Sequence, residues 1–142
     1  MPDNLDSFSK LVEVVSQLRD KENGCPWDLE QTNVSLTKYL EEETQEVVEV
    51  LNDFKVDSVT GEEVGDFDAL VEELGDVLLQ VLLHSQIASE SDKFSIEDVI
   101  VGLSEKLIRR HPHVFGDSDA STIEEVMTQW ERIKKEEKNK KV

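Results

Sequence analysis

Cysteine is nearly absent from this 142-residue chain, in which Cys25 stands alone. A single cysteine excludes an internal disulfide, and it excludes zinc or iron–sulfur sites that need several thiolates. Long apolar runs are missing too, since no stretch approaches the ~18 uninterrupted apolar residues of a membrane span. The first residues are acidic, where a signal peptide would be basic and then apolar. These absences predict a cytoplasmic protein.

Basic residues are also scarce. Fifteen Lys and Arg face 33 Asp and Glu, which leaves a formal net charge of -18. Such a charge repels phosphate backbones and argues against general binding to nucleic acids or anionic membranes. The length is close to the ~150 residues of one ordinary domain. We therefore expect one domain over residues 1–135, followed by a charged, disordered tail over 136–142.

Glycine and proline, six and three in number, lie mostly between periodic segments. Within those segments apolar residues recur about every 3.6 residues, as on one face of a helix. The pattern predicts an all-α bundle of about five helices, over residues 7–19, 35–54, 68–89, 95–111 and 121–133. Ser121 with Glu124 resembles a capping box that opens the last helix, and Pro112 ends the fourth. Residues 55–67 contain Gly61, Gly65 and several acids, and are predicted to form a loop.

The third predicted helix contains an apolar run over residues 77–83, interrupted only by Gln80. Its apolar side chains point all around the helix axis, so the helix needs cover on several sides. A chain of this length has few helices to supply that cover. We therefore expect a homo-oligomer, a dimer or a tetramer.

Certain carboxylates do not fit the pattern of solvated helix surface. At ~100° per residue, Glu43 falls in the middle of the apolar stripe of the second predicted helix and Glu46 on its border. Glu42 lies further round. Glu73 and Asp76 fall along one flank of the strongly apolar third helix. Two helices thus each present an acidic pair.

Buried carboxylates must be protonated, paired with bases or neutralised by a cation. Protonation of all four would require large upward pKa shifts, and no Lys or Arg accompanies them three or four residues away on the buried faces. A divalent cation is the simplest partner, and oxygen-only ligands suit Mg²⁺, with Mn²⁺ as a substitute. The alternative is that these residues flank the core and pair with distant bases.

Basic residues near the C-terminus supply the complementary charge. On the fourth predicted helix Lys106 and Arg110 fall beside the apolar stripe, whereas Arg109 points nearly the opposite way. Trp130 and Lys134 are four residues apart and share a helix face. Alternatively, these side chains only drape over or pack against a core edge. No glycine-rich phosphate loop is present in the sequence, so any phosphate must be held by a metal and by side chains.

Taken together, these residues resemble a known family, the MazG nucleoside triphosphate pyrophosphohydrolases of the all-α NTP pyrophosphatase superfamily. Residues 42–46, EETQE, and 73–76, ELGD, resemble its E-E-x-x-E and E-x-x-D elements. The flanking segments 24–28, GCPWD, with Gln31-Thr32, and 106–115, KLIRRHPHVF, also resemble MazG segments. The likeness extends over residues 8–135. It implies a MazG-like helical fold and Mg²⁺-dependent hydrolysis of an NTP or dNTP to the monophosphate and pyrophosphate.

The resemblance also implies roles for individual residues. Glu42 or Glu46 would be the base that activates water. Metal ligands would be Glu43, Glu46, Glu73 and Asp76, and the substrate would be bound by Lys106, Arg110, Trp130 and Lys134. The physiological role would be nucleotide-pool cleaning or regulation. Two other readings stay open: hydrolysis of a related pyrophosphate nucleotide such as an alarmone, and a non-catalytic acidic helical interaction module. Residues 55–67 form a longer connection between the two acidic helices than is usual in the family. The resemblance therefore implies no preference for a particular nucleobase.

Overall fold

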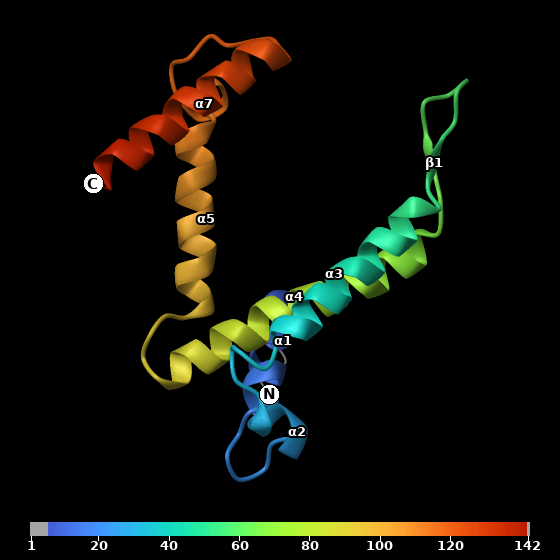
Figure 1. Cartoon of the computed structure of the whole chain (residues 1–142), viewed down its shortest axis with the longest axis vertical. Coiled ribbons are helices and arrows are strands. Elements are labelled where there is room, and N and C mark those ends of the chain that lie inside the picture. The colour runs from blue at the N-terminus through green and yellow to red at the C-terminus, as the bar shows by residue number, and fades with distance from the viewer. Residues whose placement is uncertain (1–5, 142) are drawn as a thin grey trace. The chain divides into compact units, whose positions relative to one another are not determined.

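The computed structural model describes residues 6–141. Over this range the chain forms seven helices and one two-stranded hairpin (Figure 1). The elements are α1 (Ser7–Leu18), α2 (Pro26–Glu30), α3 (Thr37–Asn52), β1 (Lys55–Val56), β2 (Glu63–Val64), α4 (Phe67–Glu90), α5 (Ile96–Arg110), α6 (Pro112–Phe115) and α7 (Ile123–Lys140). The chain divides into two compact units, residues 1–96 and 97–142. Among the described helices, none is long and apolar enough to cross a membrane.

The first unit is built on α3 and α4, which run side by side in opposite directions and are joined by the β1–β2 hairpin (Figure 1). Helix α1 packs against α4. The core gathers Val15 from α1, Leu36 at the start of α3, and Leu82 and Leu83 from α4. The C-terminal half of α4 is therefore its covered half. The N-terminal half, which carries Glu73 and Asp76, faces α3.

The helix starts follow from local capping. The carboxylate of Asp6 accepts the Ser9 backbone N–H at 2.7 Å, and that of Asp66 accepts the Ala69 N–H at 3.0 Å. Such side chains satisfy N–H groups that have no partner inside the helix. Helix α5 ends before Pro112, as the sequence predicts.

The start of the last helix is one residue later than predicted. Thr122, not Ser121, is the N-cap, and its hydroxyl accepts the Glu125 backbone N–H at 3.1 Å. The Ser121 N–H donates to the Glu125 carboxylate at 3.4 Å. The cap therefore uses Glu125 rather than Glu124. At its other end α7 continues to Lys140, so residues 136–140 of the predicted tail are helical.

The predicted loop 55–67 contains the antiparallel pair β1–β2, in which Lys55 pairs with Val64. The Asp57 carboxylate accepts the backbone N–H groups of the two residues Val59 and Thr60, at 2.8 and 2.9 Å. Gly61 has φ +75°, a left-handed conformation that glycine adopts without steric cost. The glycine and acidic residues that disfavour a helix in this segment thus form a tight turn. A second short element missed from sequence is α2, which begins at Pro26.

The second unit ties the segment after α5 to α7. The Ser118 hydroxyl donates to the side-chain oxygen of buried Gln129. The amide nitrogen of Gln129 donates to His113 Nδ1 at 3.0 Å. Gln129 therefore has a partner for each end of its amide and anchors α6 and the following loop to α7.

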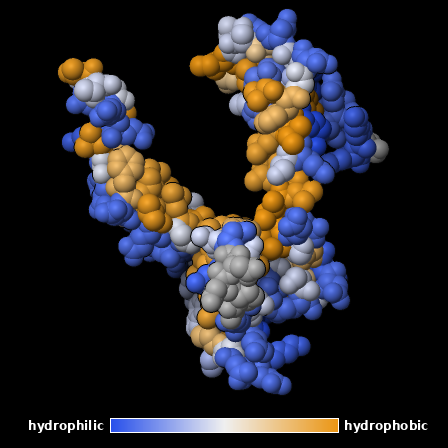
Figure 2. Space-filling model, turned by 180° about the vertical axis from the view of Figure 1, so that it is seen from behind, coloured by the Kyte–Doolittle hydropathy of each residue, from blue (hydrophilic) through white to orange (hydrophobic). Residues whose placement is uncertain are grey.

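Apolar surface remains exposed on both units. Figure 2 shows hydrophobic surface along the α3–α4 pair and along α5. On α4, Val71 is 72% exposed and Leu74 50% exposed, while Leu78 and Val81 are also partly open to solvent. Leu83, by contrast, belongs to the core. Leu78 and Val81 belong to the run 77–83 for which the sequence predicts cover by another subunit, whereas Val71 and Leu74 precede that run.

Candidate active site

The antiparallel pairing of α3 and α4 brings the four predicted metal ligands together. One carboxylate oxygen from each of the four lies within 4.8 Å of the others. Each helix contributes residues three apart, which lie on one helix face. The cluster consists of Glu43 and Glu46 from α3 and Glu73 and Asp76 from α4.

The electrostatics of the cluster are those of carboxylates without a counter-charge. Desolvation raises the pKa of Glu43, and the neighbouring carboxylates of Glu46 and Asp76 raise it further. The pKa of Glu73 rises to about 7, first through desolvation and then through a hydrogen bond to Glu46 and the nearby negative charges. No ion pair within the described chain reaches any of the four.

The donor atoms fit a metal ion. The Oε2 atoms of Glu43 and Glu73 are buried and have no hydrogen-bond partner. Buried acceptors without partners are costly, and a bound cation would remove both that cost and the mutual repulsion of the carboxylates. An all-oxygen donor set suits a hard divalent cation. The four carboxylates between α3 and α4 could therefore hold a cation.

The two candidates for the general base are placed differently. Both Glu42 and Glu46 are exposed on α3. Only Glu46 belongs to the cluster, whereas Glu42 lies outside it. A water held near the cluster would thus be closer to a carboxylate of the cluster itself than to Glu42.

All four predicted substrate-binding residues line one cavity of about 370 Å³ in the second unit. Helix α5 contributes Lys106 and Arg110, and α7 contributes Trp130 and Lys134. Arg109 does not line the cavity. Three cationic side chains around an indole form a surface suited to phosphate groups attached to an aromatic or sugar moiety.

Trp130 is held at this cavity by His111. The two rings meet edge to face with centroids 5.4 Å apart. His111 is itself fixed, because its Nδ1 lies 2.6 Å from the backbone oxygen of Leu107, to which it donates. The indole Nε1 of Trp130 is buried and has no partner. This N–H is therefore a donor available to a ligand.

Glu137 is a residue that sequence reasoning missed. Its carboxylate accepts from Arg110 Nη2 at 2.9 Å and from Arg109 Nε at 2.6 Å. These hydrogen bonds lower the pKa of Glu137 to about 2. Although Arg109 and Arg110 leave α5 in different directions, their long side chains both reach this carboxylate. Glu137 lies seven residues after Trp130, two helix turns along the same face, and this spacing was the available signal.

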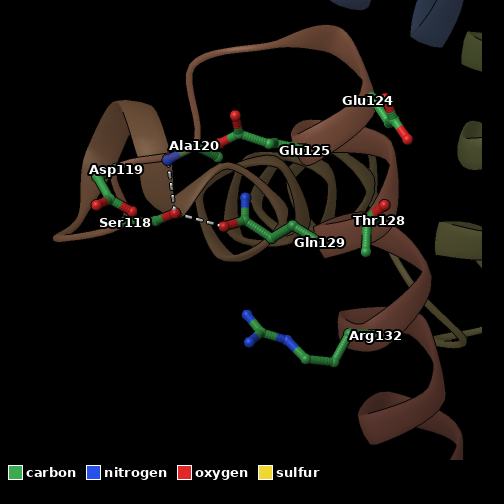
Figure 3. A pocket seen from close by; sticks show the side chains of 8 residues that line it. All are labelled: Ser118, Asp119, Ala120, Glu124, Glu125, Thr128, Gln129 and Arg132. Atoms are coloured by element: carbon green, nitrogen blue, oxygen red, sulfur yellow. Dashed lines mark hydrogen bonds between the residues drawn. The ribbon is translucent and has the colours of Figure 1, made fainter.

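A second cavity in the same unit, of about 410 Å³, contains no predicted site residue. Figure 3 shows Gln129 reaching Ser118 on the loop before α7, while Arg132 extends below them. The lining residues are Ser118, Asp119, Ala120, Glu124, Glu125, Thr128, Gln129 and Arg132. Its carboxylates make it a poor site for phosphate.

The relatives of this chain are mostly longer proteins. It is 44% identical over 137 residues to the nucleoside triphosphate pyrophosphohydrolase of Escherichia coli K12, covering 96% of this chain and 48% of that protein. It is 51% identical over 134 residues to nucleoside triphosphate pyrophosphohydrolase/pyrophosphatase MazG of Thermotoga maritima, covering 94% of this chain and 46% of that protein. The chain thus spans about half the length of these curated relatives.

A solved structure supports the fold. The crystal structure of a mazG-related protein from Thermotoga maritima matches with a TM-score of 0.68 and 27% sequence identity, over 89% of this chain and 98% of that chain. The model of the MazG nucleotide pyrophosphohydrolase domain matches residues 31–115, a span that includes the four clustered carboxylates, Lys106 and Arg110. The chain belongs to the MazG nucleotide pyrophosphohydrolase domain family.

Proposed function

We propose that this chain hydrolyses nucleoside triphosphates, NTP or dNTP, to the monophosphate and pyrophosphate with Mg²⁺. The observation that carries the proposal is the convergence of four carboxylates within 4.8 Å, two of them with buried oxygens that lack a partner. The relatives named as nucleoside triphosphate pyrophosphohydrolases support the reaction type. Mg²⁺ is favoured because it takes oxygen ligands and commonly recruits substrate phosphates.

The carboxylates have two roles in the reaction, which are to hold the cation and to accept a proton from water. Glu43, Glu46, Glu73 and Asp76 hold the cation, which when bound neutralises the phosphates and makes water more acidic. A water oxygen bonds to phosphorus at the α–β anhydride, the bridging P–O bond breaks, and pyrophosphate leaves. Glu46 accepts the water proton, because it is the exposed member of the cluster; Glu42 is the alternative.

The basic cavity binds the charged part of the substrate. Lys106, Arg110 and Lys134 bind triphosphate oxygens by charge-assisted hydrogen bonds. Trp130 contacts the nucleotide and offers its unpartnered indole N–H.

The other partner is a second copy of the chain, in a dimer or tetramer, because α4 exposes Val71 and Leu74. We place the enzyme in the cytoplasm, in nucleotide-pool cleaning or regulation, without nucleic-acid polymer or membrane as partner.

The test is a panel of NTPs and dNTPs with Mg²⁺, in which pyrophosphate and orthophosphate are both measured. Pyrophosphate with monophosphate supports the proposal, whereas orthophosphate release would place cleavage elsewhere in the triphosphate. Glu43→Gln and Asp76→Asn should abolish turnover while helicity is retained. Glu49→Gln is the matched control, since Glu49 is an exposed residue of α3 outside the cluster.

Two outcomes would favour the other readings. Absence of any turnover, together with dimerisation and capture of a partner, would favour a non-catalytic module. Faster hydrolysis of an alarmone than of any NTP in the same panel would favour the alarmone reading, because the same carboxylates can serve both reactions.

A further inference from the structure

Two polar residues of α4 continue the line of the carboxylate cluster. Glu73, Asp76, Gln80 and His84 follow one another at intervals of three, four and four residues. This spacing places them in one row along a helix face. Glu73 and Asp76 belong to the proposed cation site. Gln80 and His84 extend the row toward the core end of α4.

Both residues carry a buried polar atom without a partner. Gln80 is only 4% exposed, and its Oε1 makes no hydrogen bond. His84 Nδ1 lies 2.8 Å from the side-chain oxygen of Asn33. An amide oxygen only accepts, so Nδ1 carries a hydrogen and donates to Asn33. The other ring nitrogen, Nε2, is also buried and unpartnered.

Such atoms are not scattered over the molecule. Among the described residues, the other buried side-chain atoms without a partner are in Glu43, Glu73 and Trp130, which the proposed function already uses. Two other buried polar residues have partners: the Ser85 hydroxyl donates to the Val81 backbone oxygen at 2.8 Å, and Gln129 bonds Ser118 and His113. Because a buried acceptor without a partner destabilises the protein, its persistence points to a ligand.

We infer that Gln80 and His84 bind the edge of the nucleobase and determine base preference. This inference rests on the proposed function, in which the phosphates lie at the carboxylate cluster. The rise of an α-helix places Gln80 ~6 Å and His84 ~12 Å along α4 from Asp76. In a nucleotide the base is separated from the α-phosphate by one ribose, and its distance from that phosphate falls in this range. The Gln80 Oε1 acceptor selects a base that offers a hydrogen-bond donor at this edge, and we assign that donor to an exocyclic amino group.

The test compares CTP with UTP, which share ribose and triphosphate and differ on one edge of the base: cytosine has a 4-amino group and an unprotonated N3, and uracil has a carbonyl oxygen and an N3–H. Gln80→Leu removes the acceptor at nearly constant size. We expect the ratio of kcat/KM for CTP to that for UTP to fall about tenfold in this variant. Ser85→Ala, a change at a buried polar residue of the same helix whose hydroxyl is already bonded, should leave the ratio as in the wild type.

Equilibrium binding of the non-hydrolysable α,β-methylene analogues of CTP and UTP provides a readout independent of turnover. The same fall in the cytosine-to-uracil affinity ratio is expected. An unchanged or increased ratio in Gln80→Leu, or binding of neither analogue to the wild type, would overturn the inference. If Gln80→Leu does not fold, His84→Phe tests the second residue of the row by the same ratio.

The two proposals fail in different ways. Wild-type turnover to pyrophosphate with an unchanged ratio in the variants refutes base recognition by this row alone. Analogue binding that depends on Gln80, without any turnover, refutes the hydrolase proposal and retains the binding site.

Discussion

Arg110 and Arg109 are adjacent on α5, yet we expect their removal to affect activity very differently. Arg110 lines the cavity with Lys106, Trp130 and Lys134, whereas Arg109 does not. Both bind Glu137, so each substitution also removes one partner of that carboxylate. Arg109→Ala is therefore a control for the loss of an ion pair with Glu137, without the loss of a cation from the cavity.

The size of the difference follows from the contacts. Arg110 uses its Nε and Nη2 on Glu137, at 3.3 and 2.9 Å, which leaves other N–H donors of the guanidinium for phosphate oxygens. Loss of a charge-assisted hydrogen bond to phosphate costs ~1.5–3 kcal/mol, or roughly a ten- to hundredfold loss in kcat/KM. The Arg109 side chain is 51% exposed. Its ion pair is of the surface type that contributes ~0–1 kcal/mol to stability.

The assay is pyrophosphate release at NTP concentrations well below KM and at fixed Mg²⁺, with thermal unfolding of each variant as the check on folding. Arg110→Ala should lose ten- to hundredfold in kcat/KM, and Arg109→Ala should stay within a few-fold of the wild type. Equal losses, or a larger loss for Arg109→Ala, would refute the assignment of Arg110 to phosphate and would also remove the support for Lys106.

Three further predictions concern stability and assembly. Because the pKa of Glu73 rises from 4.5 to about 7 on folding, the folded state binds more protons between these values, so the thermal midpoint of metal-free protein should fall as pH rises through this window; Mg²⁺ or Glu73→Gln should reduce the fall, and an EDTA-treated protein that gains stability with pH would contradict it. Leu78→Lys, at an exposed position of α4, should weaken the oligomer measured by light scattering with helicity retained, whereas Leu83→Lys should unfold the protein because Leu83 is 1% exposed; a Leu78→Lys variant that keeps the wild-type mass would exclude this face as the interface. Arg19→Ala should lower the free energy of unfolding by ~3–5 kcal/mol in urea titration, since the 7% exposed Arg19 side chain pairs with Glu90 and donates to two backbone oxygens; a loss below ~1 kcal/mol, as expected for Arg109→Ala, would show that Arg19 acts as an ordinary surface residue.

The helical elements could be predicted from the sequence because helix formation depends on neighbours three and four residues away. The apolar period located α1, α3, α4 and α5 and the start of α7 to within a few residues, whereas α7 continues to Lys140, past its predicted end at Ile133. The short helix α2 and the β1–β2 hairpin were not predicted, because a repeat of apolar residues cannot be recognised in segments of two to five residues. The role of Asp57, which caps the hairpin turn, depends on hydrogen bonds that form only after the chain reverses.

The acidic pairs were also visible in the sequence, because each pair lies on one helix and local angles place it. Glu43 stood out only because it interrupts an apolar stripe, and Glu73 with Asp76 because they line a strongly apolar helix. Periodicity shows which residues share a face but not which face another helix covers. That the two pairs meet within 4.8 Å follows from the antiparallel packing of α3 on α4.

Contacts between residues far apart in the chain were decided by tertiary structure alone. Glu137 joins Arg110 across 27 residues, and His84 meets Asn33 across 51. A helical wheel of either helix gives no information on such partners, because a side chain's hydrogen bonds depend on what packs opposite it. The unpartnered polar atoms of Gln80 and His84 were invisible for the same reason: in the sequence Gln80 is one polar residue within an apolar run, and only packing reveals that its oxygen is buried with nothing to bind.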